Sequence, residues 1–228
     1  MPTSPPRIHA SIWIGIAVAV LVAGSLGFNQ LLERTLPKPK IPILATIKGD
    51  LDAIERSGQK VKFSDLRGKV TVCAFIYTIC PHGCAAVMGE MQKLNREHAS
   101  RMDFQLVSLA LLPERDTPEF LKVFAEGLQV KPSDPWWFLS GDRQRVWDFM
   151  TQELKLERAK EIPEDERLNP LDLFEHDLRI VLIDKLGQVR GYYAVFHPQA
   201  EIAKLMADKL QRHVTQLLDE PSPPKTHP

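Results

Sequence analysis

Apolar and polar residues follow each other along this 228-residue chain with two periods, one typical of strands and the other of helices. Short apolar runs rich in β-branched residues predict strands, whereas apolar positions three and four apart predict amphipathic helices. The expected strands, the first two of which form a hairpin, cover 50–55, 60–63, 70–77, 104–109, 136–139, 178–184 and 189–195. The expected helices cover 85–98, 117–127, 142–154 and 198–218.

This order of elements predicts the fold class. A strand–helix–strand unit, then a strand and a helix, then a hairpin and a last helix form an α/β sandwich around a mixed sheet. Two cysteines, Cys80 and Cys84, follow the first core strand of that sheet. Cysteines in that place favour a thioredoxin-like fold, which we expect over residues 43–218.

The chain begins with an apolar segment of a different kind. Residues 11–28 contain no charge, and with Leu31 and Leu32 the segment approaches the roughly 20 residues that span a bilayer as a helix. We therefore expect an N-terminal transmembrane helix over residues 11–32. A cleaved signal peptide is the alternative, because residues 22–24 offer small side chains at a cleavage-like position.

The regions around this segment have distinct compositions. Residues 1–10 form a short lead, residues 33–42 a proline-rich extended tether and residues 219–228 a disordered tail. One basic residue precedes the apolar segment and three follow it, so the positive-inside rule, counted literally, keeps the folded domain in the cytoplasm. Large domains cross membranes largely regardless of this count, so charge alone leaves the side open.

Overall charge and cysteine count each exclude one class of protein. The 29 basic residues balance 29 acidic ones, so no global field favours nucleic acid. Three cysteines are too few for a disulfide framework in a chain of this length. Cys73 lies inside an apolar strand, where we expect it to pack as a small buried hydrophobic residue.

The most informative motif is Cys80-Pro81-His82-Gly83-Cys84. A thiol at the start of a helix has a lowered pKa, because the unpaired N–H groups there carry partial positive charge. Thiolates are soft ligands for Cu(I), zinc or iron–sulfur clusters, and they are also the nucleophiles of disulfide exchange. The pair therefore indicates a metal site, a redox site or both.

Two thiolates need a third ligand to complete a copper site, and imidazole suits copper. Of the seven histidines, His176 directly precedes a strand, at a sheet end between two acidic residues that could orient it. His82 could add a ligand or face water, and we expect His98 and His213 on solvated helix faces. Spacing alone does not choose among these histidines.

Four stretches of the chain resemble the SCO/SenC family, copper proteins of cytochrome oxidase assembly. The resemblance extends in order over about residues 66–217. The stretches are Phe75 to Cys84 with its CPxxC motif, Pro113 to Pro118 (PERDTP), Phe138 to Asp142 (FLSGD), and Glu175 to Tyr193 with its histidine, strand and GYY hairpin.

The resemblance implies that Cys80, Cys84 and His176 bind copper as Cu(I), in a site that could also accept Cu(II). It also implies a membrane-anchored thioredoxin-like domain outside the cytoplasm and an acceptor, subunit II of cytochrome c oxidase. Three positions depart from the family pattern and leave the implied ligands unchanged. These are Ala85 in place of proline, His82 in place of aspartate or threonine, and residues 108–112 in place of a shorter acidic segment.

Two functions would use this site. The first is a copper metallochaperone for the copper centre of cytochrome c oxidase. The alternative is a membrane-anchored thiol–disulfide oxidoreductase whose redox pair, Cys80 and Cys84, reduces the acceptor's cysteines; a copper or redox sensor would use the same residues. Three residues between the cysteines, and no proline before the strand after His176, disfavour a general thioredoxin. The irregular segment 162–174 is either a docking or gating segment or a solvated linker.

Overall fold

The computed structural model describes residues 10–35 and 39–221, and the chain divides after Lys40 into two units. In the first unit, α1 (Ala10–Thr35) is one continuous helix over the apolar N-terminal segment. The expected membrane anchor is not confirmed, since within the described ranges no helix is both long and apolar enough to cross a bilayer. The expected lead and tail lie mostly outside the described residues.

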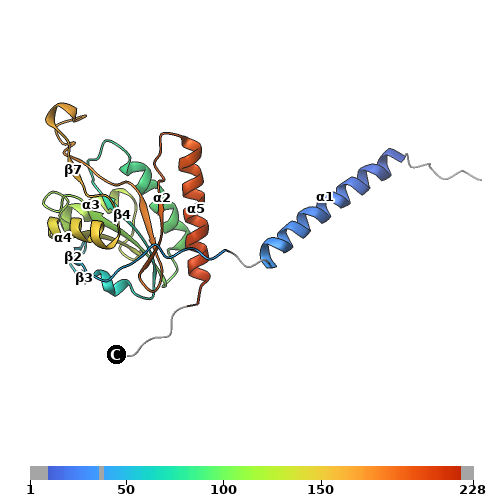
Figure 1. Ribbon diagram of the computed structural model, residues 1–228, viewed down its shortest axis with the longest axis horizontal. Coiled ribbons are helices and arrows are strands. Elements are labelled where there is room, and N and C mark those ends of the chain that lie inside the picture. The colour runs from blue at the N-terminus through green and yellow to red at the C-terminus, as the bar shows by residue number, and fades with distance from the viewer. Residues whose placement is uncertain (1–9, 36–38, 222–228) are drawn as a thin grey trace, which may run out of the picture. The chain divides into compact units, whose positions relative to one another are not determined.

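The second unit is built around one eight-stranded mixed sheet (Figure 1). Its order is β1-β10-β9-β4-β5-β6-β2-β3; β4, β5 and β6 run parallel, and the strands on either side of them run antiparallel. The strands are β1 (Ala45–Thr46), β2 (Asp52–Glu55), β3 (Lys60–Lys62), β4 (Val70–Ile76), β5 (Phe104–Ala110), β6 (Trp136–Ser140), β9 (Ile180–Ile183) and β10 (Gln188–Tyr193).

Helices cover both faces of this sheet. One layer contains α2 (Cys84–His98), α3 (Pro118–Gly127) and α5 (Ala200–Asp219). The other contains α4 (Arg143–Asp148), the π-helical turn Phe149–Glu153 that continues it, and the 3-10 turn Phe63–Leu66. Alternate side chains of β4 enter the two layers, Val72 on one face and Cys73 on the other, so the strand is buried along its whole length. Burial on both faces explains its almost continuous apolar sequence, which only Thr71 interrupts, and confirms the expected α/β sandwich.

Three predictions about single side chains have different outcomes. Cys73 is fully buried as expected, and burial raises the pKa of its thiol. The prediction for His98 is wrong, and the prediction for His213 holds only in part, because its side chain is half-buried. The His98 ring packs with its centroid 5.0 Å from that of Phe104, and His213 Nδ1 lies 2.6 Å from the Tyr193 hydroxyl oxygen, within hydrogen-bond distance. His98 therefore packs in the interior beside Phe104, whereas His213 stays partly exposed beside Tyr193.

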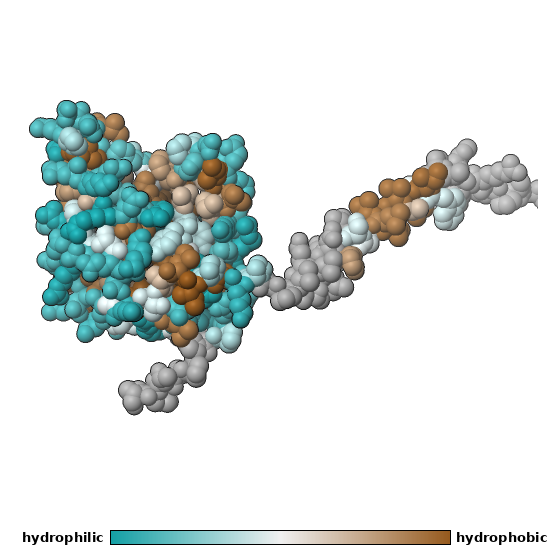
Figure 2. Space-filling view, in the orientation of Figure 1, coloured by the Kyte–Doolittle hydropathy of each residue, from teal (hydrophilic) through white to brown (hydrophobic). Residues whose placement is uncertain are grey.

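The segment 162–174 is mostly irregular, as expected, and joins two short strands. These strands, β7 (Lys160–Glu161) and β8 (Phe174–Glu175), pair with each other in a separate two-stranded sheet. Figure 1 shows this hairpin projecting from the body of the second unit. Leu168 and Leu171 are exposed in the connection, and Figure 2 shows apolar side chains at the projection within a largely hydrophilic surface.

Candidate metal centre

The cysteine pair lies between the end of a central strand and the start of a helix. β4 ends at Ile76, and α2 begins at Cys84 with Gly83 as its N-cap. The loop between them turns where the Cys80 N–H donates a 2.9 Å hydrogen bond to the Tyr77 carbonyl. Cys80 is half-buried and Cys84 is buried. Regular elements therefore place both thiols, and one of them remains open to solvent.

The two thiols share one proton at neutral pH. A hydrogen bond from the Cys84 thiol stabilises the Cys80 thiolate and lowers the pKa of Cys80 to about 3. The same interaction, together with burial, raises the pKa of Cys84 well above its ordinary value. In the metal-free protein the sequence motif therefore forms a coupled thiolate–thiol pair.

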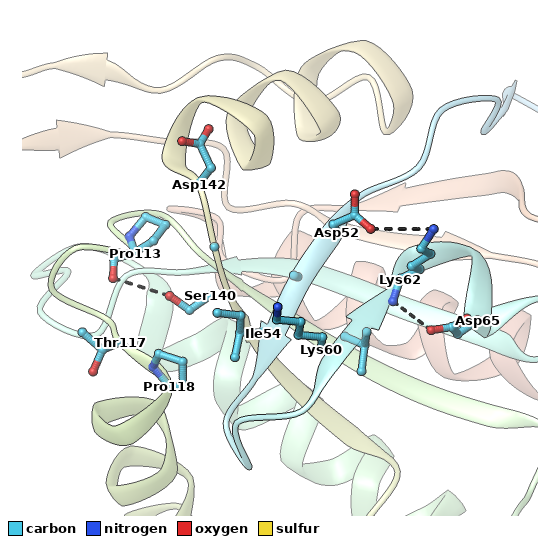
Figure 3. Close-up of a pocket in the computed structure, with 13 residues that line it drawn as sticks. Asp52, Ile54, Lys60, Lys62, Asp65, Pro113, Thr117, Pro118, Ser140 and Asp142 are labelled. Carbon is cyan, nitrogen blue, oxygen red and sulfur yellow. Dashed lines mark hydrogen bonds and ion pairs between the residues drawn. The ribbon is translucent and has the colours of Figure 1, made fainter.

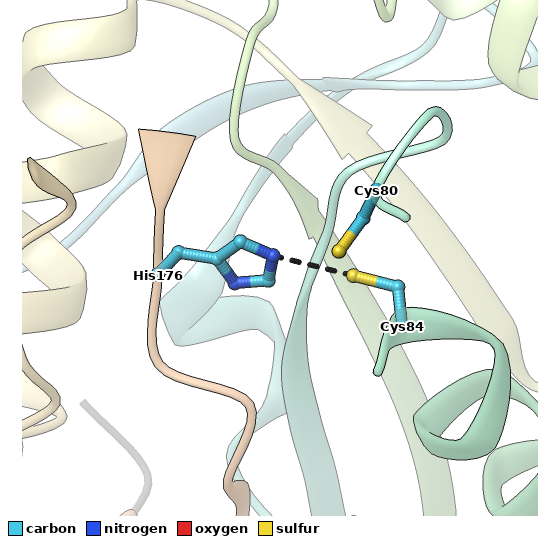
Figure 4. Close-up of side chains that lie close together, drawn as sticks. All are labelled: Cys80, Cys84 and His176. Atoms are coloured by element: carbon cyan, nitrogen blue, oxygen red, sulfur yellow. Dashed lines mark hydrogen bonds between the residues drawn. The ribbon is translucent and has the colours of Figure 1, made fainter. Parts of the chain in front are cut away.

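His176 reaches this pair from a distant part of the chain. It lies between β8 and β9, and β9 pairs directly with β4 through Cys73 and Val181. His176 Nε2 is 3.3 Å from Cys84 Sγ, and the three possible ligand atoms all lie within 4.8 Å of one another. Figure 4 shows the imidazole ring pointing at the two sulfur atoms. The three residues that the family resemblance implies are thus brought together.

The imidazole is held in the tautomer that a metal ligand needs. His176 Nδ1 lies 3.0 Å from the Asp177 backbone carbonyl, and because a carbonyl only accepts, Nδ1 carries the proton. In the neutral ring Nε2 is then the nitrogen with the lone pair, and it is the ring atom that faces the sulfur atoms. Phe75 and Tyr77 meet the ring edge to face, at centroid distances of 6.0 and 6.1 Å, and fix its plane.

Of the two acidic neighbours expected to orient His176, only Asp177 contacts it, through its backbone carbonyl instead of its carboxylate. The buried carboxylate accepts a 2.9 Å hydrogen bond from the Glu157 N–H and binds the Arg179 guanidinium. Burial opposes the ionisation of Asp177, but the hydrogen bonds from Arg179 and Glu157 outweigh it and lower the pKa. Glu175 is exposed. Asp177 therefore anchors the backbone that follows the imidazole.

His82 lies between the cysteines in sequence but outside the ligand cluster. Its Nε2 is 3.0 Å from Oδ1 of the buried residue Asp172, and the His82 side chain itself is 37% exposed. Neither expected role describes it fully, since it is neither a ligand in this geometry nor simply solvated.

Sequence reasoning missed a second support of the cysteine loop, Asp116. This residue of the PERDTP turn is fully buried and accepts a 2.6 Å hydrogen bond from the Thr78 hydroxyl, two residues before Cys80. Burial raises the pKa of its carboxyl. The resemblance marked the turn, but no local pattern connects it to the cysteines.

The cluster combines two sulfur donors and one nitrogen donor. This set suits Cu(I) or zinc, and hard ions such as magnesium or calcium prefer oxygen donors. A cavity of about 870 Å³ between the β2–β3 hairpin, the turn at Pro113 and the starts of α3 and α4 (Figure 3) is a separate feature. Its lining contains neither cysteine nor histidine, and among the described residues the ligand atoms that converge are those of Cys80, Cys84 and His176.

Fold and site together define a class of protein: a thioredoxin-like domain with a thiolate–imidazole centre at the end of its first core strand. The SCO1/SenC family model matches residues 42–211. The chain belongs to the SCO1/SenC family, which confirms the resemblance found in the sequence.

Similar proteins and structures agree with this placement. A putative copper-binding protein of Stutzerimonas stutzeri is 26% identical over 219 residues, covering 93% of this chain and 96% of that protein. Copper-bound ScoI of Bradyrhizobium japonicum has a TM-score of 0.56 at 24% identity, over 71% of this chain and 98% of that one. BsSco, a Sco-family cytochrome c oxidase assembly protein described with a disulfide switch, has a TM-score of 0.62 at 24% identity, over 80% and 100% of the two chains.

Proposed function

We propose that this protein is a copper metallochaperone that binds Cu(I) through Cys80, Cys84 and His176 and delivers it to the copper centre of cytochrome c oxidase, in subunit II. The observation that carries the proposal is the convergence of two sulfur atoms and one free imidazole nitrogen within 4.8 Å. Membership of the SCO1/SenC family supports it, as do the copper named for a Stutzerimonas stutzeri relative and the oxidase assembly named for BsSco.

The geometry suits cargo that must be taken up and released. Cys80 offers a ready thiolate, His176 offers a free lone pair, and Cys84 gives up its proton when copper arrives. Loading at neutral pH should therefore release about one proton per Cu(I). Because Cys80 is half-exposed, an acceptor thiol can approach the metal and displace the ligands one at a time. The imidazole would also allow the site to accept Cu(II).

The proposed acceptor requires the copper domain to face the outside of the cytoplasm. A membrane-anchored arrangement with the second unit on that side fits this requirement. A C-terminal alkaline phosphatase fusion, which is active only outside the cytoplasm, tests the orientation. An active fusion is expected, and an inactive fusion that is stably produced would contradict the proposed location.

A second function, thiol–disulfide oxidoreductase, is favoured by the pairing of a thiolate with a thiol. The Cys80 thiolate would attack one sulfur of an acceptor disulfide and release the other as a thiolate, which takes the Cys84 proton. Cys84 would then attack the Cys80 sulfur and release the second acceptor sulfur as a thiolate, which takes a proton from water; a Cys80–Cys84 disulfide and a reduced acceptor dithiol remain. This route needs no metal, so metal-free protein should reduce an oxidised acceptor peptide stoichiometrically.

Substitution of His176 separates the two functions. His176→Ala should weaken Cu(I) binding by at least about 100-fold, because loss of a direct ligand should exceed the effect of losing an outer partner. It should also change the Cu(II) spectrum, while the dithiol stays oxidisable. The measurement is competition for copper against a chromophoric chelator on the reduced second unit.

A matched control is His197→Ala, which removes an imidazole outside the ligand cluster. This variant should bind copper like the unsubstituted protein. Unchanged copper affinity in His176→Ala would refute the ligand assignment. Rapid peptide reduction by metal-free protein, without useful copper binding, would favour the oxidoreductase.

A further inference from the structure

One side-chain contact joins the cysteine loop directly to the segment that leads to His176. His82 Nε2 is 3.0 Å from Asp172 Oδ1, across a sequence separation of 90 residues. An ionised carboxylate only accepts hydrogen bonds. Nε2 of His82 therefore carries a proton and donates a hydrogen bond to Oδ1 of Asp172. The Asp172 side chain is 1% exposed. A carboxylate buried this deeply needs its donors, because an unpaired buried charge is costly.

Asp172 also organises the turn in which it lies. Its second oxygen, Oδ2, accepts a 3.1 Å hydrogen bond from the Leu168 N–H, and its own N–H donates to the Asn169 carbonyl at 3.0 Å. The turn from residue 168 to residue 172 is therefore closed around this carboxylate. His82 supplies the donor to Oδ1 from the cysteine loop, so the turn and that loop are bound together through Asp172.

The Tyr77 side chain forms a second connection to this segment, at the residues on either side of Asp172. The Tyr77 hydroxyl donates to the Leu171 carbonyl and accepts a 3.3 Å hydrogen bond from the Leu173 N–H. Tyr77 is buried and is the first residue of the cysteine loop, directly after β4. Both ties fasten the chain a few residues before His176, whereas Asp177 fastens it directly afterwards.

We propose that His82 is a positioning residue for the metal centre. Its hydrogen bond to Asp172, the His82 latch, holds residues 168–176 against the cysteine loop so that Nε2 of His176 faces Cys84 before any metal binds. The inference rests on the proposed copper-binding function and deepens it. The latch lowers the ordering that copper would otherwise have to impose on the histidine segment, and preorganised ligands bind more tightly for that reason.

Two substitutions of His82 differ in whether the latch can form. In His82→Gln the side-chain amide nitrogen can occupy the place of Nε2 and donate to Asp172. In His82→Asn the amide is too short to reach that place. The pair keeps a polar, uncharged amide at a partly exposed site, so differences between the two variants report the hydrogen bond itself.

The first measurement uses metal-free, reduced protein and amide hydrogen exchange. Exchange in residues 168–177 should become about tenfold faster in His82→Asn, as expected for loss of one hydrogen bond to a charged group. His82→Gln should stay close to the unsubstituted protein. Exchange in the central strands β4 and β5 should be unchanged in both variants, which separates local loosening from general destabilisation.

The second measurement is Cu(I) affinity by chelator competition. His82→Asn should bind about tenfold more weakly, in the range found when residues that support metal ligands are lost, and His82→Gln should recover most of the affinity. In a His176→Ala background, His82→Asn should cause no further loss, because the latch acts through His176.

Three results would overturn the latch. Unchanged exchange of residues 168–177 in His82→Asn would show that the contact holds nothing in place. Equal copper loss in His82→Asn and His82→Gln would remove the hydrogen bond as the cause. A further loss in the His176→Ala background would make His82 a ligand instead. If the unsubstituted protein fails to bind Cu(I), the proposed function fails, and the exchange comparison alone decides whether His82 positions the segment.

Discussion

The cysteine loop, residues 77–84, and the histidine segment, residues 168–177, supply one site by different means. The loop is placed by β4, which is hydrogen-bonded to neighbours on both sides and buried along its length, and by the first turn of α2. The segment contains one regular element, the two-residue strand β8. Its position depends on side-chain hydrogen bonds. The side chains of His82 and Tyr77 bond to residues that precede His176, and the Asp177 carboxylate fastens the chain directly after it.

Because of this difference, the cysteine loop is held in position more firmly than the histidine segment. Displacing the cysteine loop requires disruption of the central sheet, whose burial contributes much of the stability of the domain. Each tie of the histidine segment contributes only about 0.5–3 kcal/mol, the range for hydrogen bonds to neutral and charged partners. We infer that the thiols form the permanent part of the centre and the imidazole the adjustable part, which suits a metal that is passed on.

The largest expected effect concerns the ionisation of the Cys80 thiol. Iodoacetamide labelling of an ordinary thiol rises roughly tenfold per pH unit below its pKa, or about 1,000-fold from about pH 5 to about pH 8, because the thiolate is the nucleophile. The pKa of Cys80 is lowered to about 3, so its thiolate population hardly changes in that range. Labelling of Cys80 in the reduced, metal-free protein should therefore be nearly independent of pH, as followed by peptide mass spectrometry.

Free N-acetylcysteine, labelled under the same conditions, provides the ordinary profile for comparison. A Cys80→Ser variant should lose the pH-independent labelling, which assigns that labelling to Cys80. A steep rise for Cys80 in the unsubstituted protein would show that Cys84 does not stabilise its thiolate.

The cysteine half of the site could be predicted from the sequence because its causes are local. A β-branched apolar run, a turn and a helical period place Cys80 and Cys84 within one short stretch. The expected strand 70–77 and helix 85–98 correspond closely to Val70–Ile76 and Cys84–His98. The same local reasoning correctly placed Cys73 inside the core.

The next largest effect is expected from a substitution at Gly83, which tests how tightly the cysteine loop is packed. Gly83 has no room for a side chain: a Cβ there would lie 2.5 Å from Phe196 Cδ1 and 2.7 Å from Leu178 Cδ1. Gly83→Ala should therefore reduce the free energy of unfolding by about 1–3 kcal/mol, as for overpacked sites. Gly89→Ala, in the same region but with open space around the position, should be neutral or stabilise the helix by up to about 1 kcal/mol. Urea unfolding measures both; equal stability of the two variants would contradict the close packing.

The histidine half could not be predicted from local pattern. His176 follows an irregular segment, and its contact with Cys84 spans 92 residues, so only the family resemblance identified it. His82 and Asp172 belong to separate loops, and no periodicity links them. The solvated position expected for His98 was wrong for a related reason, because Phe104 of strand β5 packs against its ring.

The smallest expected effect concerns the tie that follows His176. In Asp177→Asn the amide would turn an N–H group toward either the Glu157 N–H or the Arg179 guanidinium, both of which now donate to the carboxylate. The free energy of unfolding should fall by about 1 kcal/mol at neutral pH, the scale of a hydrogen bond lost in a partly buried site. Glu175→Gln, at the exposed acidic neighbour, is the matched control and should change little.

The pH dependence of this difference follows from the direction of the Asp177 pKa shift. The pKa of Asp177 is lower in the folded protein than its ordinary value of 3.8, so its ionisation stabilises the folded state fully above that value. The contribution is lost as the pH falls through the folded-state pKa. The stability gap between Asp177→Asn and the unsubstituted protein should therefore be constant from about pH 5 to about pH 7 and narrow below about pH 4. Urea unfolding at several pH values measures the gap. If it stays unchanged in acid, the ionised carboxylate is not what fastens the backbone behind His176, and the two halves of the site are less different than their contacts indicate.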